Sequence, residues 1–232
     1  MKIKIFKSEK TFIDKSIKFI FKICENKKLI NIALSGGNTP KPIYEALAKK
    51  LAATKIPKQK INFYQVDERY VPATHPNSNQ RMIQETLIKK TGFTFHHFDT
   101  SVSIKKSLEK YSKELPKTFD LTILGIGPDG HIASLFPNSK ISEREALKCL
   151  SVAHTTTTRL RRAAIKDRLT LTFPPILNSK NLLVLLTGKE KLKIIETLKK
   201  AAKIKYKITK QQYQNFPALK LLQHKNPTIH FC

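Results

Sequence analysis

The positions of the glycines constrain the fold of this chain more than any other feature. Six of the seven glycines come directly after short apolar runs that we predict to be strands. The three runs cover residues 29–34, 119–124 and 182–186. Near-continuous apolar runs of this length are typical of parallel strands buried on both faces. Glycine after such a strand permits a tight turn and lets backbone N–H groups approach an anion closely.

Helical patterns separate the predicted strands. Apolar residues recur at helical spacing in residues 9–27, 40–53, 77–90 and 103–115, and again after residue 191. Further strands are predicted at 3–6, 61–66, 168–173 and 228–231. This alternation predicts an α/β fold with an open, mostly parallel sheet and helices on both faces. No segment resembles a linker, so we expect residues 1–232 to form a single domain, although residues 137–165 follow no clear pattern.

The charge balance is strongly basic, with 44 Lys and Arg against 17 Asp and Glu, a formal net charge of +27. A polyanionic partner is one explanation. However, the lysines are scattered, and neither zinc-finger spacing nor an RNA-binding aromatic motif accompanies them. We therefore expect a lysine-rich surface and no specific nucleic-acid partner. The positive field would still attract a phosphorylated substrate.

The sequence predicts a cytoplasmic protein. There is no signal-peptide pattern and no apolar run long enough to cross a bilayer. The three cysteines, Cys24, Cys149 and Cys232, are odd in number and widely spaced, which argues against a disulfide framework. We expect no membrane association and a monomer or weak homo-oligomer.

Four polar clusters follow predicted strands, at residues 35–40, 67–69, 125–131 and 187–191. Ligands of open α/β sheets bind outside the carboxyl ends of the strands, so these clusters should meet at one edge. In the first cluster, Ser35, Gly36, Gly37 and Thr39 precede a helix whose N-terminus would favour a phosphate. A simple helix cap explains the same residues equally well. The cluster is neither a Walker A loop nor a nucleophile elbow.

The third cluster contains the strongest candidate for catalysis. Gly125 to Gly130 matches G-x-G-x-x-G, but Pro128 and the lack of an acidic residue after the next strand argue against a dinucleotide site. His131 follows in a loop, where a neutral imidazole could take a proton from water, and Asp129 could orient it. The alternatives are a structural histidine or a metal ligand. Two further ligands are not evident, so we predict no metal.

Three cations near predicted strand ends are candidate anion binders: Arg69, Arg168 and Lys191. Arginine presents a planar fork that matches the oxygens of phosphate or carboxylate. The neighbouring histidines His96 and His97 fit a surface or loop pair better than a site.

Five motifs together resemble the 6-phosphogluconolactonase family, within the superfamily of glucosamine- and galactosamine-6-phosphate isomerases. They are Ser-Gly-Gly-Asn-Thr-Pro at 35–40, Asp-Glu-Arg-Tyr-Val-Pro at 67–72 with Ser78-Asn79, the segment 124–137, Arg-Leu-Thr-Leu-Thr at 168–172, and Gly-Lys-Glu-Lys at 188–191. The resemblance implies a Rossmann-like sheet, no cofactor, and hydrolysis of 6-phospho-D-glucono-1,5-lactone in the oxidative pentose phosphate pathway.

The resemblance also implies roles for single residues. His131 would activate water, with support from Asp129, and Arg69 would help to stabilise the oxyanion. The 35–37 loop, Arg168 and Lys191 would hold the phosphate. The matching positions Thr39, Asp67, Asn79 and Gly127 would complete the substrate site.

Two other functions within the superfamily remain as alternatives. A glucosamine-6-phosphate deaminase shares the Asp-Gly-His loop, and Ile132 matches its pattern, but that enzyme has Glu five residues after the histidine, where this chain has Phe136. The Asp-Glu-Arg cluster also favours the lactonase, because deaminases usually carry Asp-Glu-Tyr there. A non-catalytic sugar-phosphate sensor would normally carry a helix-turn-helix segment, and we expect none.

The chain departs from the lactonase pattern in two places. Residues 155–162 lack the usual proline-rich run, which leaves open which cations reach the phosphate among Arg159, Arg161, Arg162, Arg168 and Lys191. Residues 227–232 lack the common Trp and Asp, so the way in which the last strand closes the domain is also open.

Overall fold

A parallel sheet of seven strands forms the centre of the computed structural model, which describes residues 1–24, 29–54, 56–57, 60–139, 148–153, 167–203 and 208–232. Within these residues the strand order is β1-β10-β9-β6-β2-β3-β5, and every neighbouring pair is parallel. The strands are β1 (Lys2–Ile5), β10 (Pro227–Phe231), β9 (Leu182–Leu186), β6 (Leu121–Leu124), β2 (Ile30–Leu34), β3 (Ile61–Gln65) and β5 (Thr94–His96). The prediction of an open, mostly parallel α/β sheet is confirmed.

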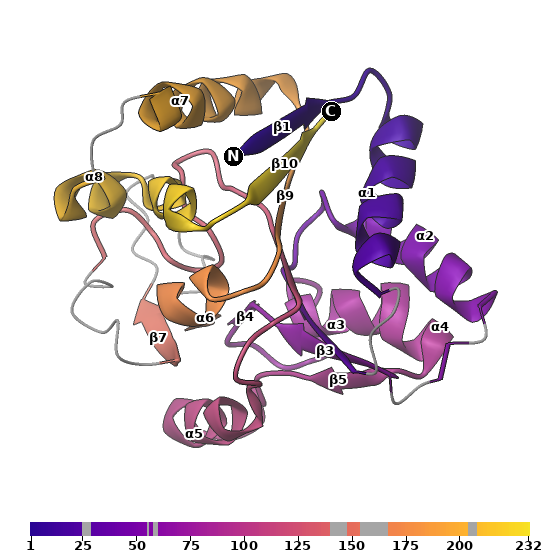
Figure 1. Ribbon diagram of the computed structural model, residues 1–232. Helices are drawn as coiled ribbons and strands as arrows, with labels where there is room; N and C mark the ends of the chain where they lie inside the picture. The colour runs from indigo at the N-terminus through magenta and orange to yellow at the C-terminus, as the bar shows by residue number, and fades with distance from the viewer. Residues whose placement is uncertain (25–28, 55, 58–59, 140–147, 154–166, 204–207) are drawn as a thin grey trace.

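Helices cover both faces of this sheet, as Figure 1 shows with α1 on one side of the strands and α7 on the other. One face carries α1 (Glu9–Cys24), α2 (Lys41–Ala52) and a continuous helical segment of α3 (Asn79–Ile83), the π-helix η2 (Gln84–Ile88) and α4 (Lys89–Thr91). The other face carries α5 (Ile104–Glu114), α6 (Phe173–Leu177), the 3-10 turn η4 (Lys189–Lys191), α7 (Leu192–Lys203), α8 (Lys210–Asn215) and the 3-10 segment η5 (Pro217–Gln223).

The alternation of side chains along each strand explains why the predicted strands are apolar throughout. In β9, Leu183 and Leu185 pack in the core with α1 and α2. Leu182, Val184 and Leu186 point to the opposite side and pack in the core with α7. Since both faces are covered, every position of such a strand is buried and apolar side chains are favoured at all of them.

A second, antiparallel sheet lies on the α7 side and changes the interpretation of residues 67–69. It consists of β4 (Asp67–Arg69), β8 (Asp167–Leu171) and β7 (Cys149–Ala153). Residues 67–69, expected as a cluster at a strand end, form a strand of their own that pairs with β8. Buried Val66 links the two sheets, because its N–H donates to Leu34 O and its carbonyl accepts from Leu171 N–H.

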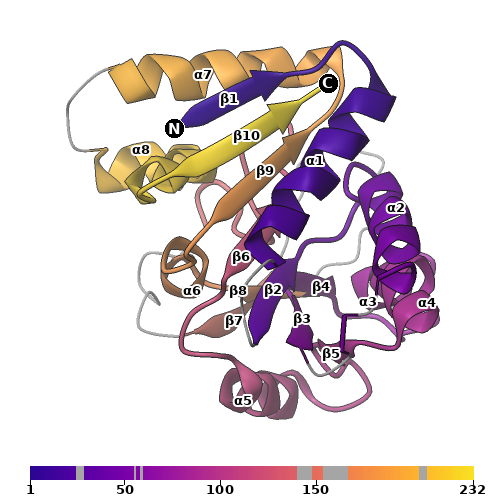
Figure 2. The ribbon, with the colours of Figure 1, turned by 45° about the vertical axis from the view of Figure 1, so that its right-hand side comes forward.

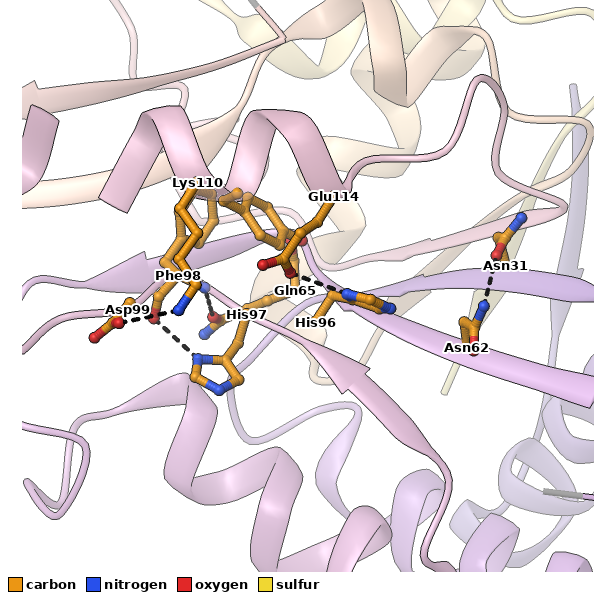
Figure 3. Close-up of polar contacts among 10 residues, drawn as sticks. Asn31, Asn62, Gln65, His96, His97, Phe98, Asp99, Lys110 and Glu114 are labelled. Carbon is orange, nitrogen blue, oxygen red and sulfur yellow. Dashed lines mark hydrogen bonds and ion pairs between the residues drawn. The ribbon is translucent and has the colours of Figure 1, made fainter. Parts of the chain in front are cut away.

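The structure also adds elements that the sequence did not predict. Strand β7 lies within 137–165, of which residues 140–147 and 154–165 are outside the described part of the chain. Strand β5 was missed, and His96, expected in a surface or loop pair, lies at the end of this edge strand with its side chain 26% exposed. Figure 3 shows His96 pointing toward Glu114. Its Nδ1 lies 3.0 Å from Glu114 Oε2, and its ring stacks on that of Tyr64 with the centroids 4.5 Å apart. His97 does follow the strand in a loop, half-buried, with Nδ1 3.1 Å from Phe98 O.

None of the helices in the described ranges combines the length and the apolar character needed to cross a membrane.

Candidate active site

A cleft of about 190 Å³ opens at the carboxyl ends of β2, β3 and β6. It is lined by Ser35, Gly36, Gly37, Asn38, Thr39, Pro40, Asp67, Arg69, Asn79, Gly125, Ile126, Gly127, His131 and Ala133. After β2 the chain enters α2 on one face of the sheet, whereas after the neighbouring β6 it turns to the other face. Figure 2 shows the two strands side by side. The cleft therefore lies at a topological switch point, where open sheets bind ligands.

The turn after β2 forms one wall through a close approach that requires glycine. A Cβ at Gly36 would lie 1.9 Å from Asn79 Oδ1, so any larger residue would displace the Asn79 side chain. The buried Tyr44 hydroxyl donates to Ser35 O at 2.9 Å and anchors the turn to α2. Ser35 is 5% exposed, and its Oγ has no hydrogen-bond partner among the described residues. Ser35 lines the cleft with this hydroxyl buried in the wall.

A fully buried carboxylate, Glu68, positions the opposite wall. Five groups donate to it, at 2.7–3.0 Å: the backbone N–H groups of Arg69, Asn79 and Gln80, the Gln65 amide and the Ser78 hydroxyl. Burial raises the pKa of Glu68, and these hydrogen bonds oppose the rise. Glu68 thereby joins β4 to the first turn of α3, and so fixes the two elements that carry Asp67, Arg69 and Asn79.

The third wall carries the histidine–carboxylate pair. His131 Nδ1 lies 2.5 Å from Asp129 Oδ1, and the His131 backbone N–H donates to the same oxygen at 3.2 Å. Partial burial of Asp129 would raise its pKa, but the bond from His131 outweighs this effect and the pKa is lowered. A Cβ at Gly127 would lie 2.0 Å from His131 Cε1, so the imidazole rests directly on the Gly127 backbone. No helix opens in residues 125–139, consistent with the argument against a dinucleotide site.

Hydrogen bonds hold this wall against the second sheet. Ser134 Oγ donates to Asp67 Oδ2 at 2.8 Å, and the Ser134 N–H donates to Thr170 Oγ1 at 3.2 Å. Asn79 Nδ2 in turn donates to the Asp67 carbonyl at 2.9 Å. Asp67 therefore connects the His131 loop to the segment that carries Asn79, and the walls of the cleft form one hydrogen-bonded frame.

Two arginines lie side by side at the edge of the cleft. Arg69 lines it, with Nη1 donating to Asn77 O at 2.7 Å, and Arg168 is the cross-strand partner of Arg69 in the β4–β8 pair. Arg168 does not line the cleft. Burial, and next the charge of Arg69, lower the pKa of Arg168. Its buried Nε and Nη1 have no hydrogen-bond partner among the described residues.

The loop after β9 contacts the walls of the cleft from outside. Lys191 Nζ donates to the Ile126 carbonyl at 2.9 Å. Thr187 Oγ1 lies 3.0 Å from Thr39 Oγ1. Three of the four predicted polar clusters thus line the cleft, and the fourth supports it.

The structure brings nine of the twelve predicted site residues into the lining of one cleft: Ser35, Gly36, Gly37, Thr39, Asp67, Arg69, Asn79, Gly127 and His131. The other three contact residues of the lining. Asp129 bonds to His131, Arg168 is the cross-strand partner of Arg69, and Lys191 donates to the Ile126 carbonyl. Arg159, Arg161 and Arg162 lie outside the described residues. In the part of the chain that is described, no three His, Cys, Asp or Glu side chains gather as metal ligands would.

Sequence reasoning missed several residues that build the site. Asn38, Pro40, Gly125, Ile126 and Ala133 also line the cleft, and all are sequence neighbours of predicted residues. Glu68 was not selected, although it stands between two residues that were. Its role depends on donors ten to twelve residues away, and nothing in the local pattern indicates them.

The fold and the cleft define an α/β enzyme with a histidine–carboxylate pair at the switch point of its sheet. The family model described as "Glucosamine-6-phosphate isomerases/6-phosphogluconolactonase" matches residues 9–226, and the chain belongs to this family. It is 40% identical over 185 residues to the 6-phosphogluconolactonase of Thermotoga maritima, covering 77% of this chain and 79% of that protein.

Solved structures agree with this assignment. The crystal structure of 6-phosphogluconolactonase from Thermotoga maritima superimposes with a TM-score of 0.80 at 31% identity, over 99% of this chain and 98% of that one. A monomeric glucosamine-6-phosphate deaminase gives a TM-score of 0.84 at 20% identity, over 100% of this chain and 97% of that one. This second likeness shows that the fold is shared.

Proposed function

We propose that this protein hydrolyses 6-phospho-D-glucono-1,5-lactone to 6-phospho-D-gluconate, a step of the oxidative pentose phosphate pathway. The observation that carries the proposal is the Asp129–His131 pair in a cleft whose walls also hold Arg69 and the 35–39 turn. Family membership and the 40% identical lactonase of Thermotoga maritima support it.

In the proposed mechanism His131 is the general base. Because Asp129 occupies Nδ1, Nε2 remains as the basic nitrogen, and it takes a proton from a water molecule as the water oxygen attacks C1 of the lactone. The carbonyl oxygen becomes an oxyanion that Arg69 stabilises. When the C1–ring oxygen bond breaks, the imidazolium returns the proton to the departing oxygen, and the open-chain acid forms.

The phosphate of the substrate would be held away from the reacting carbon. The 35–37 turn and Thr39 supply backbone and hydroxyl donors at the start of α2, where a phosphate is favoured. Arg168 has two buried nitrogens without a partner among the described residues, and Lys191 lies against the cleft wall. Binding the phosphate would orient the lactone toward His131, since a tethered reactant attacks at a much higher effective concentration. Asp67, Asn79 and Gly127 shape the remaining walls.

The alternative activity, deamination of glucosamine 6-phosphate, has less support. The residue beside the His131 imidazole is Phe136, with ring centroids 4.8 Å apart, and an aromatic hydrocarbon ring cannot transfer a proton. We further propose that the protein acts in the cytoplasm without cofactor, specific nucleic acid or membrane, as a monomer or weak homo-oligomer.

The direct test is the release of acid from freshly prepared 6-phosphogluconolactone, corrected for spontaneous hydrolysis. Acceleration by the pure protein is expected. A rate equal to the spontaneous one, with ammonia released from glucosamine 6-phosphate instead, would transfer the proposal to the deaminase. A folded protein inactive in both assays would favour a non-catalytic sensor.

A further inference from the structure

The imidazole of His131 requires more than one contact to hold its orientation. The bond to Asp129 fixes one ring atom, Nδ1, but a single hydrogen bond allows the ring plane to turn about it. The His131 side chain is 29% exposed, so the remaining surroundings do not enclose it. The Gly127 backbone supports the ring at Cε1 and Nδ1. The Phe136 ring also packs against the imidazole, with the ring centroids 4.8 Å apart and an interplanar angle of 49°.

We propose that Phe136 is a positioning residue that keeps the His131 imidazole aimed into the cleft. This inference rests on the proposed function, because it gives Phe136 a role in the reaction through His131. Phe136 is not among the residues that line the cleft, so it would act on the orientation of the base and not on substrate binding.

The chain around Phe136 is built to hold its ring in place. Pro137 follows it, and a residue before proline is restricted to extended backbone conformations. The Ser139 hydroxyl donates to Phe136 O at 2.6 Å, and the Asn138 N–H donates to Gln214 O, in α8, at 2.8 Å. On the other side, Leu135 is fully buried in the core of the α7 face. Both flanks of Phe136 are therefore anchored, which holds its ring against the imidazole.

The contact also has a consequence for proton transfer. The hydrocarbon ring of Phe136 has no group that could compete for the proton on Nε2 of His131. A flexible or small residue at 136 would let the ring leave the reacting position for part of the time. Small displacements of a catalytic group lower the rate of the chemical step without weakening the binding of substrate.

The test is the Phe136→Ala variant, compared with wild type and with Phe136→Tyr, which keeps the ring. We expect kcat on the lactone to fall on the order of tenfold in Phe136→Ala, with KM unchanged, and to be largely retained in Phe136→Tyr. A matched control is Phe95→Ala, since Phe95 contacts His97 at 5.4 Å outside the cleft. This control should leave kcat unchanged.

A second readout does not depend on activity. In protein with isotope-labelled histidine, NMR relaxation of the His131 ring should show greater ring motion in Phe136→Ala than in wild type or Phe136→Tyr. If the wild type is active but Phe136→Ala keeps a wild-type kcat and a rigid ring, the role of Phe136 is refuted and the proposed function stands. If the wild type has no lactonase activity, the proposed function fails. Unchanged ring motion in Phe136→Ala would separately refute the claim that Phe136 fixes the orientation of the imidazole.

Discussion

Replacing Gly127 by alanine should displace the catalytic imidazole while leaving the rest of the cleft intact. The added Cβ would lie 2.0 Å from Cε1 and 2.1 Å from Nδ1 of His131. Ordinary van der Waals contact begins at about 3.4 Å, so the ring must retreat by about 1.4 Å. The His131 side chain is 29% exposed and can move toward solvent, which keeps the effect on folding small.

A retreat of this size is large for a catalytic group. Misplacement of a reacting group by about 1 Å can cost about 10²-fold in rate, so kcat of Gly127→Ala should fall by about that factor. The bond to Asp129 would be strained by the same movement. Since the phosphate contacts lie on other walls, KM should change little. Initial rates of acid release at several lactone concentrations would separate kcat from KM.

A contrasting variant shows whether the displaced ring is the cause. Gly36→Ala places its Cβ 1.9 Å from Asn79 Oδ1, and so moves a wall residue and not the base. It should raise KM more than it lowers kcat. A folded Gly127→Ala protein with a wild-type kcat would refute the role of the displaced ring. So would the same pattern of change in kcat and KM in both variants.

Three further outcomes follow from the structure. Glu68→Ala should lower the free energy of unfolding in urea by about 3 kcal/mol, because five donors lose a buried acceptor. An unchanged urea midpoint of unfolding would contradict the role of Glu68 in joining β4 to α3. Burial, and next Lys4, lower the pKa of His230 from 6.5 to about 4, so its contribution to stability is complete above pH 6.5. That contribution is lost as the pH falls toward 4, by up to about 3 kcal/mol, and His230→Asn should flatten the pH dependence of urea unfolding between these values. Finally, the net charge of +27 should make kcat/KM for the anionic lactone fall with added salt while kcat stays constant; a salt-independent kcat/KM would exclude steering.

The sequence was sufficient to predict the central strands β9, β6 and β2 of the main sheet, because they are apolar on both faces and are each followed by glycine. The convergence of distant loops followed from the same pattern, since parallel strands present their carboxyl ends at one edge. His131 and Asp129 could be paired from sequence because only Gly130 separates them, and the structure places their side chains in contact.

Other features depend on partners that the local pattern does not reveal. Strand β4 has only three residues, and it is a strand because β8, a hundred residues later, pairs with it. Arg168 lies near the start of β8 and beside Arg69, as expected for a second anion binder, but it is not part of the cleft lining. His96 is polar and adjacent to another histidine, but stacking on Tyr64 and the bond to Glu114 place it in an edge strand.

In the proposed mechanism the imidazole of His131 activates water in this cleft. The most direct measurement is kcat of His131→Ala on 6-phosphogluconolactone, with folding verified by urea unfolding. We expect a loss of about 10²-fold or more with KM preserved, the scale of a missing general base. A folded variant that opens the lactone at nearly the wild-type rate would show that another group is the base.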